Sequence, residues 1–177
     1  AVTGANNNLT LDTTTTTGSA DNTFTGDINL GSGALNVTGD VVLAANVTVT
    51  TTKGSGTGIT FNDAINADSA GNNDRTLTLN AGTASGIQVT GTVGNSQALA
   101  GLTITQSNNT AFSSTVDVSD TNSGTITLTD TTDGRNIVFG NNVTADTFTT
   151  AAQGYDIFFI GDATFANAVT FQNTGTL

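Results

Sequence analysis

One short spacing recurs along this chain: an apolar residue, three residues of any kind, and then an apolar residue that is most often valine or isoleucine. It occurs at Phe24/Ile28, Val37/Val41, Phe61/Ile65, Val89/Val93, Phe112/Val116, Phe139/Val143 and Phe165/Val169. From the second unit onward, the steps between successive units are 24, 28, 23, 27 and 26 residues. A step of this size held along a chain is typical of a repeat architecture. The sequence is therefore predicted to build one cross-section several times over.

A second kind of segment lies between these units, in which apolar residues alternate with threonine. Examples are residues 47–49, 77–79, 102–104 and 126–128, and the more apolar residues 157–160 occupy the same place near the carboxyl end. Alternation with a period of two indicates a half-buried strand. Each step of about 25 residues is thus predicted to hold two or three short strands.

Short strands in a fixed step predict a parallel β-solenoid, also called a parallel β-helix. About seven coils stacked at the strand spacing of about 4.8 Å would form a rod about 34 Å long. The handedness of parallel crossovers predicts a right-handed coil. The alternative is an antiparallel β-sandwich, but the hairpin dipeptides Asn-Gly and Asp-Gly occur only once, at Asp133-Gly134. We expect one all-β solenoid segment over residues 1–177, as part of a longer repeat protein.

The repeat also predicts which side chains form the core. In the closing stretch, Phe165 is expected to end one inward position, and Val169 and Phe171 are expected to stack near Val143 and Val116. Threonine should coat the outside, and asparagine should occupy the corners. The predicted core residues are Phe24, Ile28, Phe61, Ile65, Val89, Val93, Phe112, Val116, Phe139, Val143, Phe165, Val169 and Phe171.

The charge balance excludes some partners. All fourteen acids are aspartates, and they stand against three bases, which gives a formal charge of −11. Binding to nucleic-acid phosphates needs clustered basic residues, whereas Lys53, Arg75 and Arg135 are scattered. No apolar run approaches the roughly 20 residues that a membrane-spanning helix needs. We expect no nucleic-acid partner and no membrane insertion.

The style of several segments resembles a known family. Residues 76–82, 98–104 and 148–156 are similar to the loose Thr-, Asn-, Gly- and Val-rich repeats of filamentous-haemagglutinin-like and autotransporter-passenger β-solenoids of bacteria. The likeness covers roughly residues 24–177 and includes no diagnostic motif. The resemblance implies an extracellular protein at the cell surface, of adhesin or stalk type, which is exported as an unfolded chain. The absence of cysteine suits such export.

Catalytic chemistry is restricted by what the chain lacks. Without histidine or cysteine, neither a Ser-His-Asp site nor a Cys-His site can form, and a thiolate metal site is excluded as well. The pairs Asp117/Asp120 and Asp130/Asp133 remain as candidates for glycoside cleavage. Aspartate in turns usually caps backbone amides, however, and a saccharide cleft would carry aromatic platforms, whereas the chain has no tryptophan and only Tyr155.

We therefore expect no enzyme, no catalytic residue and no cofactor. The same four aspartates are weak candidates for calcium, because neither segment matches the EF-hand loop or the glycine-rich nonapeptide that binds calcium in other solenoids.

Paired threonines raise one further function. They occur at Thr48/Thr50, Thr76/Thr78, Thr103/Thr105 and Thr125/Thr127, with steps of 28, 27 and 22 residues. A flat array of outward threonines would bind ice, but these irregular steps argue against such a face, and threonine is an ordinary outward residue of exposed strands.

The leading expectation is a structural surface or filament protein that acts by coil stacking and by self-association, or contact with neighbouring repeats, end to end. The alternatives are a carbohydrate- or ice-binding module, for which host or surface glycans would be the partners, and a polysaccharide-active enzyme.

Overall fold

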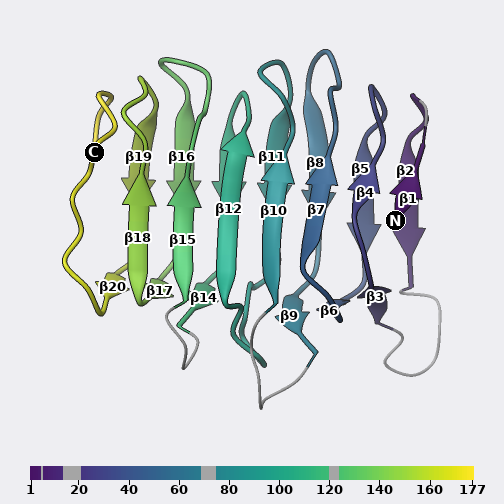
Figure 1. The fold of residues 1–177 in the computed structure, drawn as a ribbon, viewed down its shortest axis with the longest axis horizontal. Helices are drawn as coiled ribbons and strands as arrows, with labels where there is room; N and C mark the ends of the chain where they lie inside the picture. Colours follow the sequence, from purple (N-terminus) through teal and green to yellow (C-terminus); the bar gives the residue numbers. More distant parts are fainter. Residues whose placement is uncertain (5, 14–20, 69–74, 120–123) are drawn as a thin grey trace.

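The computed structural model describes residues 1–4, 6–13, 21–68, 75–119 and 124–177, which contain twenty strands and no helix. The strands pair in parallel and stack side by side along the long axis of the molecule, with the two termini at opposite ends (Figure 1). The chain makes about six full turns, so that seven strands lie in each of the two larger sheets. The predicted all-β parallel solenoid is confirmed, and the antiparallel sandwich is excluded. The right-handed sense of the coil stays a prediction.

Each full turn crosses three faces and contributes one strand to each, except that, among the described residues, the turn of β10 (Thr76–Asn80) and β11 (Gly86–Val89) has no strand on the third face. Sheet A contains β1 (Val2–Thr3), β4 (Ile28–Asn29), β7 (Val47–Thr50), β10 (Thr76–Asn80), β12 (Gly101–Gln106), β15 (Thr125–Leu128) and β18 (Thr147–Thr150). Sheet B contains β2 (Leu9–Asp12), β5 (Leu35–Thr38), β8 (Thr57–Phe61), β11 (Gly86–Val89), β13 (Thr110–Phe112), β16 (Asn136–Phe139) and β19 (Asp156–Phe159).

The third face, sheet C, comes in two parts. One part contains β3 (Asn22–Phe24), β6 (Val41–Leu43) and β9 (Ile65–Ala67), and the other contains β14 (Val116–Val118), β17 (Val143–Ala145) and β20 (Ala163–Phe165). Val93 alone connects them, because it bridges Ile65 on one side and Val116 on the other. Gly94 follows it with a φ of 75°, a left-handed conformation that favours glycine.

The corner between sheets B and C explains the recurring spacing. Three residues separate the last inward residue of sheet B from the first inward residue of sheet C in coil after coil. One ladder of paired residues therefore runs through Val37, Phe61, Val89, Phe112, Phe139 and Phe159. The neighbouring ladder runs through Val41, Ile65, Val93, Val116, Val143 and Ala163. All of these residues except Phe159 and Ala163 are buried.

The first and last units of the spacing do not belong to these ladders. Phe24 pairs with Leu43 in sheet C, and Phe165 pairs with Ala145 in the same sheet. The predicted stacking of Val169 near Val143 is wrong, since Ala163 occupies that place. A three-residue corner also joins β3 to β4, so the same spacing arises at two different corners of the coil.

The predicted core residues divide into two groups. Phe165, Val169 and Phe171 are only partly buried and pack against the core at the carboxyl end. The other ten are buried: Phe24, Ile28, Phe61, Ile65, Val89, Val93, Phe112, Val116, Phe139 and Val143.

The core carries an aromatic column along sheet B. The rings of Phe112 and Phe139 stack at 5.1 Å with an angle of 4°, and those of Phe139 and Phe159 stack at 5.2 Å with an angle of 8°. Parallel in-register pairing places identical side chains one coil apart, which brings the rings face to face.

Candidate functional site

The acidic candidates serve the backbone and the neighbouring side chains. Asp117 accepts hydrogen bonds from the amide and the hydroxyl group of Ser119. Asp130 accepts one from the Gln106 side chain at 2.9 Å, and Asp133 accepts one from the Gly154 amide at 3.1 Å. Asp120 lies outside the described residues, so its pairing with Asp117 stays a prediction. In the described parts of the chain, no three acidic side chains gather as a metal site would require.

Many corner side chains join one coil to the next. Oδ1 of Asn8 accepts a hydrogen bond from the amide of Ala34 at 2.9 Å, and Oδ1 of Asn46 accepts one from the amide of Thr76 at 2.9 Å. Further bonds of this kind join Asp27 to Thr48, Asp40 to Ala64, Asn66 to Ser96, Asn109 to Asn136 and Asn142 to Asp162. The sequence predicts aspartate and asparagine at corners, but the structure shows that their acceptors reach a different coil.

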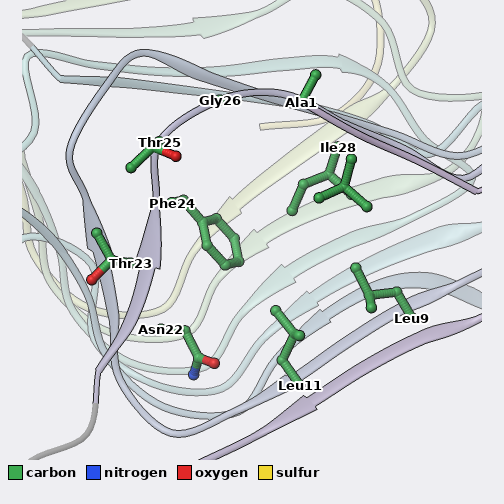
Figure 2. Close-up of a pocket in the computed structure, with 10 residues that line it drawn as sticks. Ala1, Leu9, Leu11, Asn22, Thr23, Phe24, Thr25, Gly26 and Ile28 are labelled. Atoms are coloured by element: carbon green, nitrogen blue, oxygen red, sulfur yellow. The ribbon is translucent and has the colours of Figure 1, made fainter.

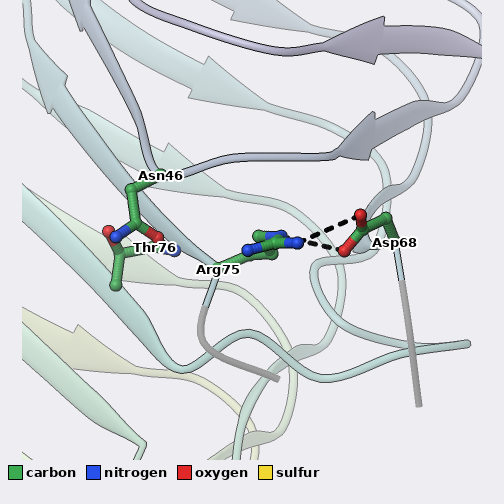
Figure 3. A network of polar contacts seen from close by, with 4 residues as sticks. All are labelled: Asn46, Asp68, Arg75 and Thr76. Carbon is green, nitrogen blue, oxygen red and sulfur yellow. Dashed lines mark hydrogen bonds and ion pairs between the residues drawn. The ribbon is translucent and has the colours of Figure 1, made fainter. Parts of the chain in front are cut away.

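Among the described residues, an ion pair lies just before the start of β10, the central strand of sheet A (Figure 3). Nε of Arg75 lies 2.9 Å from Oδ1 of Asp68, and a second guanidinium nitrogen donates to Oδ2 at 3.2 Å. The hydrogen bond from Arg75 lowers the pKa of Asp68 below its ordinary value. This contact lies beside the hydrogen bond between Asn46 and Thr76. We assign it a structural role.

The single tyrosine lies in the core. Tyr155 is fully buried, and its hydroxyl group donates to the carbonyl oxygen of Leu128 at 2.8 Å and accepts from the amide of Ala151 at 3.1 Å. Burial raises the pKa of Tyr155 above its ordinary value. The ring is therefore not available as a saccharide platform.

A group of buried hydroxyl side chains follows the corner between sheets A and B. Oγ of Ser107 lies 2.8 Å from Oγ1 of Thr110 and 3.0 Å from Oγ1 of Thr131. Ser85 donates to the carbonyl oxygen of Ala81 at 2.6 Å. Thr51 is also fully buried at this corner. Ser107, Thr110 and Thr131 satisfy one another within the rod, whereas the buried hydroxyl oxygen of Thr51 has no hydrogen-bond partner among the described residues.

The amino end of the core is an open hollow (Figure 2). It has a volume of about 310 Å³, and Val2, Leu9, Leu11, Phe24 and Ile28 contribute its apolar wall. These residues belong to the first coil and to the start of the second. The residues that the structure describes therefore leave this end of the interior uncovered.

The carboxyl end is aromatic and partly exposed. The ring centre of Phe148 lies 4.9 Å from that of Phe165 and 5.8 Å from that of Phe171, while the ring centres of Phe159 and Phe165 are 6.0 Å apart. Residues 166–177 run along β18 and β19 without forming a strand, and the amide of Thr174 donates a hydrogen bond to the carbonyl oxygen of Gln153 at 2.8 Å. Ile160, nearby, is 70% exposed.

A shallow polar groove lies over the corner between sheets A and B. It has a volume of about 430 Å³ and is lined by Ser55, Gly56, Thr57, Ala84, Gly86, Ile87, Gln88, Asn108, Asn109 and Ala111. Neither a ring nor a charged side chain is among these residues. The groove offers amide groups to a ligand but no platform on which a sugar ring would stack.

Threonines form a continuous column on the outer face of sheet A. Thr48 pairs with Thr78, and the register continues through Thr103, Thr127 and Thr149. The irregular steps in the sequence argue against a flat, lattice-matched face; the structure aligns one column of threonines in spite of these steps, and the flatness of the face stays untested. The connections between the sheets differ in length and absorb the irregularity, most of all those from sheet C back to sheet A: eight residues lie between β9 and β10, six between β14 and β15, and one between β17 and β18.

Comparisons with known proteins add no evidence on the function of this chain. No protein-family model, no curated protein and no solved structure matches the chain. Among the residues that the structure describes, no helix is long and apolar enough to cross a membrane.

Proposed function

We propose that the chain is a structural solenoid segment of an extracellular surface or filament protein, which acts by stacking coils end on end. One observation carries the proposal: the apolar interior runs from one end of the rod to the other and is not closed at the amino end. The buried core residues Phe24 and Ile28 line the hollow there, together with Leu9 and Leu11, which pack against the core.

The strand edges support the same conclusion. β1, β2 and β3 are the outermost strands of their sheets at the amino end. An outermost strand presents a row of unpaired amide and carbonyl groups, which is a template for another strand. Proline, which blocks such pairing, is absent from the chain. A further coil of the same kind satisfies these groups, whether it comes from adjoining repeats or from a second copy.

The surface location rests on other grounds. The resemblance to filamentous-haemagglutinin-like and autotransporter-passenger repeats implies export, and the chain has no cysteine that could be oxidised outside the cell. An exterior rich in threonine, asparagine and aspartate, with few bases, suits a stalk in water. The described acidic candidates are engaged in turn and inter-coil hydrogen bonds, which favours a structural role over a catalytic one.

Sedimentation velocity tests the end-to-end contact. The wild type is expected to sediment faster as concentration rises, and more so at high salt, because salt screens the repulsion between chains of charge −11. Val2→Asp places a charge in the wall of the hollow at a residue that is 48% exposed, so the rod should still fold. We expect this variant to stay monomeric.

The matched control is Thr60→Asp. It adds the same charge to the outer face of sheet B, in the middle of the rod. This variant should associate nearly as the wild type does. A wild type that stays monomeric at every concentration and salt would overturn the proposal, and so would association of Val2→Asp equal to that of the control.

A further inference from the structure

We propose that the outer face of sheet A is an ice-binding surface. This role goes beyond end-to-end stacking and does not depend on it. The face consists of the side chains that point away from the core on β7, β10, β12, β15 and β18. Its central column is Thr48, Thr78, Thr103, Thr127 and Thr149, one residue from each of five successive coils.

The flanking columns extend the array in the second direction. On one side, Thr76, Thr125 and Thr147 share a column that is interrupted by Gly101. On the other side, Thr50 pairs with Asn80. None of these flanking residues carries a charge. The column ends at the coil of β4, where Asp27 accepts a hydrogen bond from the Thr48 amide.

The array is a property of this sheet and not of exposed strands in general. The equivalent outward column of sheet B over the same coils is Thr60, Gln88, Ala111, Val138 and Phe158. On sheet C, threonine holds half of the outward positions and forms no unbroken column; these positions are Thr23, Val42, Asn66, Asp117, Thr144 and Thr164. If threonine were placed only because it suits strands, all three faces would carry it equally. The unequal distribution points to a use for the sheet A face.

The geometry suits a periodic ligand. Parallel pairing repeats the hydroxyl and methyl groups about every 4.8 Å along the rod, and alternate residues of a strand repeat them about every 6.8 Å across it. Both distances are close to repeats of water molecules in planes of the ice lattice. Threonine is branched at Cβ, so few rotamers are open to it, and little side-chain freedom is lost on binding.

The chemistry of the face also favours ordered water. Each threonine offers one hydroxyl group that donates and accepts hydrogen bonds, beside a methyl group that prefers not to contact liquid water. A neutral array has no charge that would hold disordered hydration water, and its threonines offer no aromatic platform for a flexible glycan. Water fixed in a lattice can match all rows of the array at once, whereas liquid water cannot.

The test uses the whole chain and two variants that carry the same bulky ring. Thr103→Tyr projects from the centre of the sheet A array, and Thr60→Tyr projects from the centre of the outer face of sheet B. Thermal hysteresis and the growth of ice grains in a frozen film are measured for each protein. Melting curves are compared first, to establish that both variants fold as the wild type does.

We expect the wild type and Thr60→Tyr to slow the growth of ice grains and to separate the freezing from the melting point. Thr103→Tyr should lose both activities, because the ring holds the neighbouring hydroxyl groups away from the ice plane. A wild type without either activity would overturn the proposal, as would equal losses in the two variants. Co-sedimentation with crystalline cellulose or chitin, without any effect on ice, would also overturn it and would assign the face to polysaccharide.

Discussion

The alternation of inward and outward residues on β16 makes a sharp prediction, because adjacent residues of one strand should differ greatly when truncated. Phe139 is fully buried, with rings stacked on both sides at 5.1 and 5.2 Å and Phe148 edge-on at 6.1 Å. Val138 points outward from the same strand and is half-buried. We compare Phe139→Ala with Val138→Ala.

The magnitude for Phe139→Ala follows from the cavity that it leaves. Truncating a buried phenylalanine costs about 3–5 kcal/mol, and each aromatic pair is worth about 0.5–1.5 kcal/mol beyond the buried area. With two stacked partners lost, we place the change in the upper part of that range. Val138→Ala removes two methyl groups from a surface that stays partly wet, which costs about 0.5–1 kcal/mol.

Urea unfolding measures the difference. The midpoint should fall markedly for Phe139→Ala and only slightly for Val138→Ala, with little change in the slope of free energy against urea. A slip of one residue in the register would exchange the two faces of the strand. Equal effects, or a larger effect for Val138→Ala, would refute the alternation on which the described core depends.

Three further changes probe other parts of the rod. Val116→Asp places an unpaired charge among buried residues, so it should lower the free energy of unfolding by several kcal/mol in the same urea experiment. Asp68 has a lowered pKa in the folded protein, so the stabilisation by Arg75 is present above the ordinary pKa of 3.8 and is lost as the pH falls through the folded value. Arg75→Gln should therefore raise the pKa of Asp68, which a carboxyl titration by NMR measures. Tyr155 has a raised pKa, so the stability of the wild type should fall as the pH rises past the ordinary value of 10.0, because the tyrosine of the unfolded chain ionises first. Tyr155→Phe should lack this loss of stability at alkaline pH, which melting curves at a series of pH values measure.

The repeat could be read from the sequence because one corner has a constant length. Phe61 and Ile65 stand in the same relation as Phe139 and Val143, since three residues always separate sheet B from sheet C. The same spacing at Phe24 and at Phe165 arises from a different corner. Sequence spacing alone does not distinguish two corners of equal length, so the register at both ends of the chain had to come from the structure.

The threonine column could not be predicted from the sequence, for a related reason. Its members are separated by 30, 25, 24 and 22 residues, because the connections between the sheets vary in length, above all those from sheet C back to sheet A. Strand pairing, and not sequence distance, fixes which threonines lie side by side. The partners of Asp40 and Asn46 were hidden likewise, since each lies a whole coil away along the chain.

The direction of the hydrogen bonds between coils has a mechanical consequence. Strand pairing and the corner bonds of residues such as Asn8 and Asn142 both run along the rod, and the termini lie at its two ends (Figure 1). Tension applied between the ends therefore opens these bonds one after another, as in a zipper, instead of shearing many at once. Each coil of about 25 residues would release about 80 Å of slack at the extended length per residue. Single-molecule pulling should show a series of low, evenly sized steps, and one abrupt rupture would contradict this behaviour. A rod of this kind absorbs force gradually and re-forms coil by coil from the part that remains wound.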